Sequence, residues 1–98
     1  MRFKNKIVLI TGSAGGIGFK TALDFGNEGA IVAVTDIDFE MAKKLSNQII
    51  SNGGIAEPLQ LDVTNLEQTK NVFEVLNQKY GVCDIVFCNA GIREITPM

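Results

Sequence analysis

Short apolar runs alternate along the chain with segments in which apolar residues recur every three or four positions. The apolar runs occupy residues 7–11, 31–35, 55–61 and 83–88. Three of them are almost entirely apolar, as strands covered on both faces by helices tend to be. The pattern predicts a β-α-β-α-β-α-β order, and short right-handed connections then produce an α/β fold with a doubly wound parallel sheet.

The three segments between the runs have the spacing of amphipathic helices. The residues expected on their apolar faces are Phe19, Ala22, Leu23 and Gly26 in the first, Met41, Ala42, Leu45 and Ile49 in the second, and Leu66, Thr69, Phe73, Leu76 and Tyr80 in the third. Asp38 is placed to cap the second helix, and Thr64 forms a capping box with Glu67 before the third.

Pro58 lies inside the third apolar run and predicts where that strand belongs in the sheet. Proline cannot donate a hydrogen bond to a ladder, so a strand that contains it is expected at an edge. The doubly wound order 3-2-1-4 places the third strand there. The alternative interpretation is a bulge at Pro58, or a strand that begins after it.

The composition is that of one small globular domain or a piece of a larger one, with 98 residues, 46% hydrophobic and 20% charged. A net charge of −2 without histidine gives no reason to expect nucleic acid or an anionic membrane as partner. No apolar run approaches the roughly 20 residues of a membrane span, so a soluble cytoplasmic protein is the default expectation. Cys83 and Cys88, in one predicted strand, would point to opposite faces, which suits neither a disulfide nor a metal site.

Four glycines crowd into the stretch ITGSAGGIG at residues 10–18, between the first apolar run and the first helical segment. A helix N-terminus at this corner offers unpaired amides and the positive end of the helix dipole. Glycine removes the side chain that would block a phosphate and permits a tight turn, so Gly12, Gly16 and Gly18 predict a pyrophosphate site. The alternatives are ordinary turn glycines or a P-loop around Lys20, which lacks the required preceding glycine.

The second apolar run is followed by Asp36, about 20 residues beyond the glycine stretch, where dinucleotide-binding folds hold the adenosine ribose. A carboxylate there accepts hydrogen bonds from both ribose hydroxyls and repels a 2′-phosphate. No Arg or Lys lies in residues 10–19 or immediately after Asp36 to neutralise such a phosphate. We therefore expect NAD in preference to NADP. The other role for Asp36, a helix cap, is better filled by Asp38.

The stretch from Thr11 to Gly18 resembles the TGxxxGxG fingerprint of the classical short-chain dehydrogenases/reductases. Leu61-Asp62-Val63-Thr64 resembles the family segment that flanks the adenine ring, and Cys88-Asn89-Ala90-Gly91 resembles its NNAG element, with cysteine at the first position. The resemblance runs from Lys6 to Ile92 and implies a Rossmann-type, NAD-binding half-domain over residues 1–98. The residues that it assigns to the cofactor are Gly12, Ser13, Gly15, Gly16, Ile17, Gly18, Asp36, Ile37, Asp62, Val63, Asn89, Ala90 and Gly91.

The resemblance implies hydride transfer between NAD and a small secondary alcohol or ketone, in an enzyme that is commonly a homo-oligomer. The family's proton-transfer group is a tyrosine with a lysine four residues later. The only tyrosine here is Tyr80, and Asp84 follows at that spacing, an anion that would raise a tyrosine pKa. We interpret the chain as the cofactor-binding half of a longer enzyme, or a truncated product, without the catalytic C-terminal half. A non-catalytic nucleotide-binding module is the alternative hypothesis.

Overall fold

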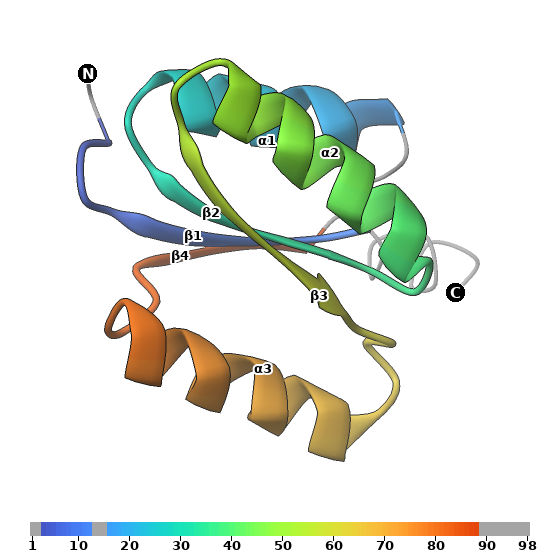
Figure 1. Ribbon diagram of the computed structural model, residues 1–98. Helices are drawn as coiled ribbons and strands as arrows, with labels where there is room; N and C mark the ends of the chain where they lie inside the picture. The colour runs from blue at the N-terminus through green and yellow to red at the C-terminus, as the bar shows by residue number, and fades with distance from the viewer. Residues whose placement is uncertain (1–2, 13–15, 89–98) are drawn as a thin grey trace.

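The computed structural model describes residues 3–12 and 16–88 of the chain. Strands and helices alternate through these residues as predicted (Figure 1). The elements are β1 (Ile7–Thr11), α1 (Gly16–Asn27), β2 (Ile31–Asp36), α2 (Phe39–Ser51), β3 (Ile55–Gln60), α3 (Leu66–Lys79) and β4 (Ile85–Cys88). The strand pairs are parallel, and the described strands lie in the order β3-β2-β1-β4. The prediction of a doubly wound α/β sheet with strand order 3-2-1-4 is confirmed.

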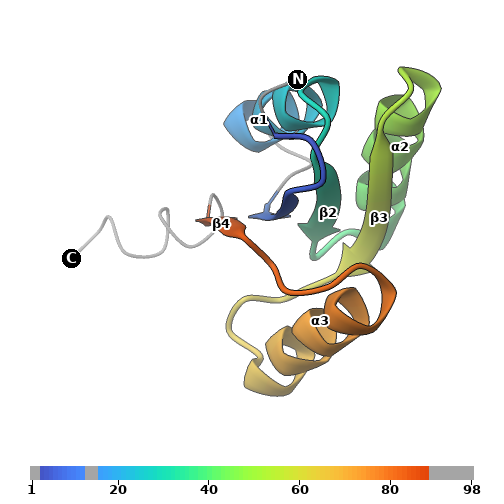
Figure 2. The same ribbon diagram turned by 90° about the vertical axis from the view of Figure 1, so that its left-hand side faces the viewer.

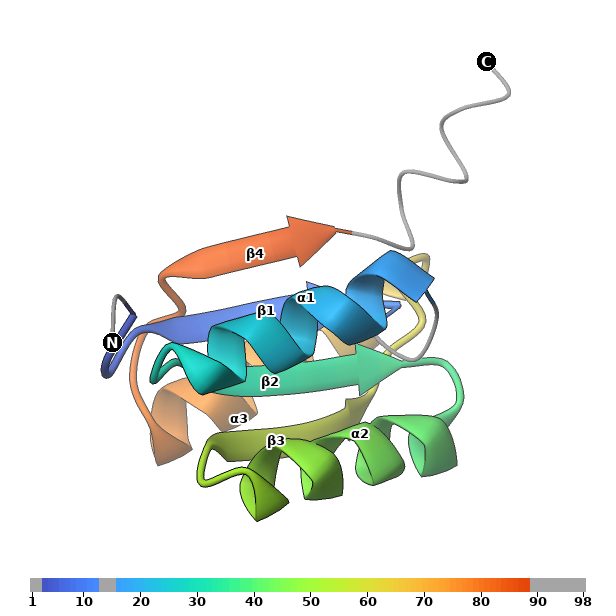
Figure 3. The ribbon, with the colours of Figure 1, turned by 90° about the horizontal axis from the view of Figure 1, so that it is seen from above.

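The helices cover both faces of the sheet. Figures 1 and 3 show α1 and α2 on one face and α3 on the other. Side chains alternate along β1, so Val8 and Ile10 belong to the core under α1 and α2 while Leu9 packs in the core under α3. Burial on both faces explains why the inner strands are almost entirely apolar.

Pro58 lies in a strand at the edge of the described sheet, as predicted. Figure 2 shows β3 and β4 at opposite edges. Pro58 is opposite Val34 in the ladder between β2 and β3, and the ladder ends with Gln60 opposite Asp36. The strand therefore contains its proline without a bulge, and it stops one residue before the predicted limit at Leu61.

The two helices on the first face meet at Gly26 of α1 and Ile49 of α2. Gly18, Ala22 and Gly26 are the buried residues of α1, and two of them, Ala22 and Gly26, are among the four predicted positions. The other two, Phe19 and Leu23, are partly buried against the same core. A Cβ atom at Gly26 would lie 2.8 Å from Cγ2 of Ile49 in α2. Any side chain at position 26 would therefore collide with α2, which explains the glycine near the end of α1.

Three residues that were predicted to face the sheet do not. Met41 in α2 is 41% exposed, and in α3 Leu66 is 83% and Phe73 36% exposed. The buried residues of α3 are Val72 and Leu76, one turn apart, which define a narrow stripe against the sheet. Phe73 lies about 100° around the helix from Val72, and Leu66 is the first residue of its helix.

The start of α3 also differs from the prediction. Asn65 is its N-cap, and Oδ1 of Asn65 accepts a hydrogen bond from the Gln68 amide at 3.0 Å. Thr64 instead donates its hydroxyl to Asp62 at 2.7 Å. The predicted capping box of Thr64 with Glu67 is therefore wrong by one residue, because Asp62 engages the threonine.

The chain joins the ladder of β4 only at Ile85. Cys83 lies before the strand, so the prediction that Cys83 and Cys88 share one strand is wrong. The thiol of Cys83 is free, and its sulfur lies 3.2 Å from the carbonyl oxygen of Ile85 and 3.6 Å from that of Ile7. Asp84 explains the late start, because its carboxylate accepts a hydrogen bond from the Ile7 amide in place of a ladder partner.

Candidate functional site

The carboxyl ends of the parallel strands lie together at one end of the sheet. The predicted cofactor residues follow these strand ends. Figure 3 shows the strand arrowheads at this common end. Gly12 comes directly after β1, Asp36 is the last residue of β2, and Asp62 lies two positions after β3. Because the strands are parallel, three residues that are far apart in the sequence come to the same end of the sheet, where α1, α2 and α3 begin.

Glycines form the corner between β1 and α1. Gly12 has a φ of 60°, and Gly16, the first residue of α1, has a φ of 37°. Residues that carry a side chain rarely adopt such positive φ angles. A Cβ at Gly16 would meet no atom within 4 Å, so the space in front of it is open. Ile17 is 70% exposed, and Gly18 is buried against the sheet side of the helix. The first amides of a helix have no partner within it and carry its positive dipole end, which suits an anion.

Five predicted cofactor residues lie outside the described part of the chain. They are Ser13 and Gly15 in the glycine stretch and Asn89, Ala90 and Gly91 after β4. The strand before the second group is described, and Cys88 is opposite Thr11 at the end of β1. The segment from Asn89 thus follows a strand that stops at the same end of the sheet as β1.

Asp36 and Asp38 have different roles. Asp38 is the N-cap of α2, and its Oδ1 accepts a hydrogen bond from the Met41 amide at 3.3 Å. Oδ1 of Asp36 accepts a hydrogen bond from the Asp38 amide at 3.0 Å. The carboxylate of Asp36 is therefore oriented by the turn after β2, and Asp38 is the helix cap, as the sequence favoured.

A second turn after β3 holds Asp62. Its Oδ1 accepts hydrogen bonds from the Thr64 hydroxyl at 2.7 Å and the Thr64 amide at 3.0 Å. These bonds, the hydroxyl first, favour the ionised carboxylate and lower the pKa of Asp62. Val63 is half-buried and packs against the core under α3, so its side chain serves the fold.

Two glutamines that the sequence analysis did not single out hold these turns. Gln60 donates from Nε2 to the carbonyl oxygen of Ile37 at 3.0 Å. Gln68 accepts a hydrogen bond at Oε1 from the amide of Asp62 at 2.6 Å. The signal that could have found Gln60 is its place at the end of a strand beside Asp36, since an amide side chain there can reach the neighbouring turn.

Tyr80 lies at the C-terminal end of α3, away from the turns after the strands, and it has a structural role there. Its hydroxyl donates to Oε1 of Glu57 at 3.1 Å, and Nζ of Lys79 lies 3.2 Å from Oε2 of Glu57. Burial, and then the bond to the Glu57 carboxylate, raise the pKa of Tyr80. The predicted direction is confirmed, but the responsible anion is Glu57 on β3 and not Asp84. Tyr80 therefore provides no proton-transfer group at the strand ends.

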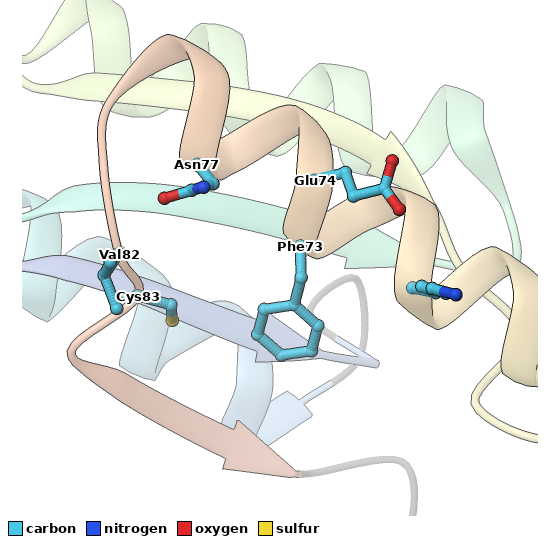
Figure 4. A pocket seen from close by; sticks show the side chains of 6 residues that line it. Phe73, Glu74, Asn77, Val82 and Cys83 are labelled. Carbon is cyan, nitrogen blue, oxygen red and sulfur yellow. The ribbon is translucent and has the colours of Figure 1, made fainter.

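A shallow groove of about 430 Å³ lies between α3 and the segment before β4 (Figure 4). It is lined by Lys70, Phe73, Glu74, Asn77, Val82 and Cys83, and by none of the predicted cofactor residues. Burial raises the pKa of the Cys83 thiol, which favours its protonated form. The described residues hold no cluster of metal-binding side chains, and none of their helices is long and apolar enough to cross a bilayer.

The sequence profile of the short chain dehydrogenase family matches residues 6–98. This chain belongs to that family. Among its relatives, the uncharacterized oxidoreductase YxjF of Bacillus subtilis is 37% identical to this chain over 95 residues. The alignment covers 97% of this chain and 37% of YxjF, so the chain spans little more than a third of that relative's length.

Solved structures share the arrangement of this chain. A hydroxysteroid dehydrogenase from Escherichia coli has a TM-score of 0.86 at 31% identity, over 89% of this chain and 37% of its own. An oxidoreductase from Haemophilus influenza with bound NAD gives 0.83 at 32% identity, over 87% and 30%. A metagenomic short-chain oxidoreductase in complex with NADP gives 0.83 at 26% identity, over 88% and 39%. Structures with either dinucleotide therefore resemble this chain.

Proposed function

We propose that this chain is the NAD-binding half of a short-chain dehydrogenase that interconverts a secondary alcohol and a ketone by hydride transfer. The observation that most supports this function is that Gly12, Asp36 and Asp62 lie at the same end of the sheet, where the strands stop and the helices begin. The nicotinamide of the cofactor supplies or accepts the hydride in such a reaction, and the protein binds and orients the cofactor.

The pyrophosphate of NAD would bind at the N-terminus of α1. Gly12 and Gly16 keep side chains out of its path, and the open space at Gly16 supports this assignment. The first amides of the helix, together with the Ser13–Gly15 stretch, would donate hydrogen bonds to the phosphate oxygens. Gly18 lets α1 pack closely on the strands behind the site.

The adenosine would lie toward β2 and β3. The carboxylate of Asp36 would accept hydrogen bonds from the two ribose hydroxyls, with Ile37 beside the adenine. The Asp62 side chain and the Val63 backbone would form the other wall of the adenine site. On the other side of β1, Asn89 would help to hold the central strands, and Ala90 and Gly91 would leave space for the cofactor.

The preference for NAD over NADP rests on Asp36. Its carboxylate would repel the 2′-phosphate of NADP, whereas it would bond directly to the free hydroxyl of NAD. The next residue is Ile37, which is 63% exposed and carries no charge that could bind a phosphate. Because the similar structures include complexes with either dinucleotide, this local chemistry supports NAD more specifically than family membership does.

The rest of the proposed enzyme would supply the catalytic groups and the substrate pocket. The chain spans 37% of YxjF, and the described residues contain no tyrosine at the strand ends. We therefore assign proton transfer and recognition of a small alcohol or ketone to a C-terminal half. Homo-oligomerisation of the whole enzyme belongs to the same proposal.

Titration calorimetry with NAD and NADP at up to millimolar concentration tests the cofactor assignment. We expect the chain to bind NAD more tightly than NADP. Replacing the carboxylate in Asp36→Ala should weaken NAD binding by roughly tenfold to a hundredfold, with little loss for NADP. Asp24→Ala, an exposed aspartate late in α1, is the matched control and should bind like the original chain. Tighter binding of NADP by the unmodified chain would refute the assignment.

A non-catalytic nucleotide-binding module is the second candidate. It is favoured by the engagement of Tyr80 with Glu57, which leaves the chain's single tyrosine unavailable for proton transfer. The two candidates differ in turnover. Extension of the chain by a catalytic half should give NAD-dependent oxidation of secondary alcohols if the first is correct, whereas binding of NAD without turnover supports the second.

A further inference from the structure

The turn after β2 is tied to the neighbouring strand by two hydrogen bonds. Gln60, at the end of β3, is opposite Asp36 in the ladder. The Leu61 amide donates to the carbonyl oxygen of Asp36 at 3.0 Å, and Nε2 of Gln60 donates to the carbonyl oxygen of Ile37 at 3.0 Å. Consecutive carbonyl groups of the turn are therefore held from β3, one by the backbone and the other by a side chain.

The peptide unit between Ile37 and Asp38 links Gln60 to the Asp36 carboxylate. The oxygen of this peptide accepts from Gln60, and its N–H group donates to Oδ1 of Asp36 at 3.0 Å. Because a peptide unit is planar and rigid, a bond that fixes its oxygen also fixes the direction of its N–H group. Hydrogen bonds in such a chain also polarise and strengthen one another.

We propose that Gln60 is a positioning residue that sets the Asp36 carboxylate through this shared peptide, and so contributes to binding of the adenosine ribose. This inference rests on the proposed function. Gln60 is exposed, and its bond to Ile37 is exposed as well, so the bond adds little to the stability of the fold. Its effect on ligand binding is therefore separable from any effect on folding.

Gln60→Met tests the proposal, because methionine keeps the length of the side chain and removes the donor. We expect NAD binding, measured by calorimetry, to weaken by about two- to tenfold, with an unchanged Tm. Gln60→Glu should weaken binding further, since a carboxylate would face the Ile37 carbonyl without a proton to donate. Gln78→Met, at an exposed position of α3, is the control and should leave affinity unchanged.

A double-mutant cycle distinguishes action through Asp36 from a general loosening of the surface. If Gln60 acts through the carboxylate, Gln60→Met should have no further effect on NAD affinity in an Asp36→Ala background. Full additivity of the two substitutions would overturn the proposal. The same loss of affinity for AMP as for NAD would support it, because both ligands contain the adenosine ribose.

Residue-resolved amide hydrogen exchange gives a readout that does not depend on the ligand. The Asp38 amide should exchange faster in Gln60→Met than in the original chain, because its peptide is no longer held at the oxygen. If the original chain binds NAD and Gln60→Met binds it with the same affinity, the role of Gln60 is overturned while the proposed function stands. Failure of the folded original chain to bind NAD at millimolar concentration would overturn the proposed function, and with it this role in binding.

Discussion

Asp84 and Ile7 bind each other twice where β1 and β4 come together. The Ile7 amide donates to Oδ2 of Asp84 at 2.8 Å, and the Asp84 amide donates to the carbonyl oxygen of Ile7 at 2.8 Å. The ladder that follows pairs Val8 with Ile85 and ends with Thr11 opposite Cys88. This contact therefore fixes the register that brings the end of β4 beside the glycine corner.

The aspartate contact predicts a specific loss of stability. Asp84→Ala should lower the free energy of unfolding by about 1–2 kcal/mol, because the Ile7 amide loses a charged acceptor. Asp84→Asn keeps an acceptor oxygen and should lose less. Urea denaturation of both variants measures the difference, and Asp24→Ala on α1 controls for loss of an exposed carboxylate. Equal stability of Asp84→Ala and the original chain would show that the contact does not hold β4.

Much of the fold could be predicted from the sequence because few arrangements satisfy its strongest constraints. Strands that are almost entirely apolar need helices on both faces, and Pro58 excludes the third strand from the middle of the sheet. The carboxyl ends of parallel strands must then lie at the same end of the sheet, which brings Gly12 and Asp36 to that end. These constraints depend on the residue type and its place along the chain, both of which the sequence contains.

The remaining errors concern contacts that no local pattern encodes. Phe73 and Val72 both fit a helical apolar face, and only the position of the sheet decides that Val72 is buried. The partner of Tyr80 is Glu57, 23 residues away on β3, and the nearer Asp84 is bound to Ile7 instead. Gln60 likewise reaches a backbone carbonyl 23 residues away, so its role becomes visible only in three dimensions.

The close approach of α1 and α2 predicts that Gly26→Ala is destabilising. Its Cβ would lie 2.8 Å from Cγ2 of Ile49, a β-branched residue with little freedom to rotate. Overpacking of this kind costs about 1–3 kcal/mol, more than the gain of up to about 1 kcal/mol in helix propensity. Ile49→Ala removes the colliding methyl group, so Gly26→Ala should cost less in that background. Chemical denaturation of the four proteins in this cycle tests the claim, and an unchanged cost would contradict it.

Tyr80 predicts a loss of stability at alkaline pH. Its pKa in the folded chain is raised above the ordinary value of 10.0, so the stability from the protonated phenol is complete below that value. It is lost as the pH rises through the raised pKa of the folded state, because the ionised phenolate faces Glu57. Since the chain has one tyrosine, tyrosinate absorbance reports this titration directly, and its midpoint should move down in Glu57→Gln.

Tyr80→Phe gives the matching thermodynamic measurement. The stability difference between the original chain and Tyr80→Phe should shift in favour of the variant as the pH rises above the ordinary tyrosine pKa of 10.0 and through the raised pKa of the folded chain. Only the difference between the two proteins is informative, because it cancels the effects of the groups that they share. A constant difference across this range would contradict the role assigned to the Glu57 contact.

The outer edge of β4 predicts concentration-dependent association of this chain. Within the described residues β4 pairs with β1 on one side only, and Val86 on this strand is 47% exposed. An edge strand with apolar side chains can pair with another copy, whereas a lysine on the strand discourages such pairing. Val86→Lys should therefore increase the monomer fraction in sedimentation velocity at high concentration. Leu66→Lys removes a more exposed apolar side chain at the start of α3, away from this edge, and should leave association unchanged. If both substitutions reduce association equally, general surface hydrophobicity, and not the strand edge, causes it.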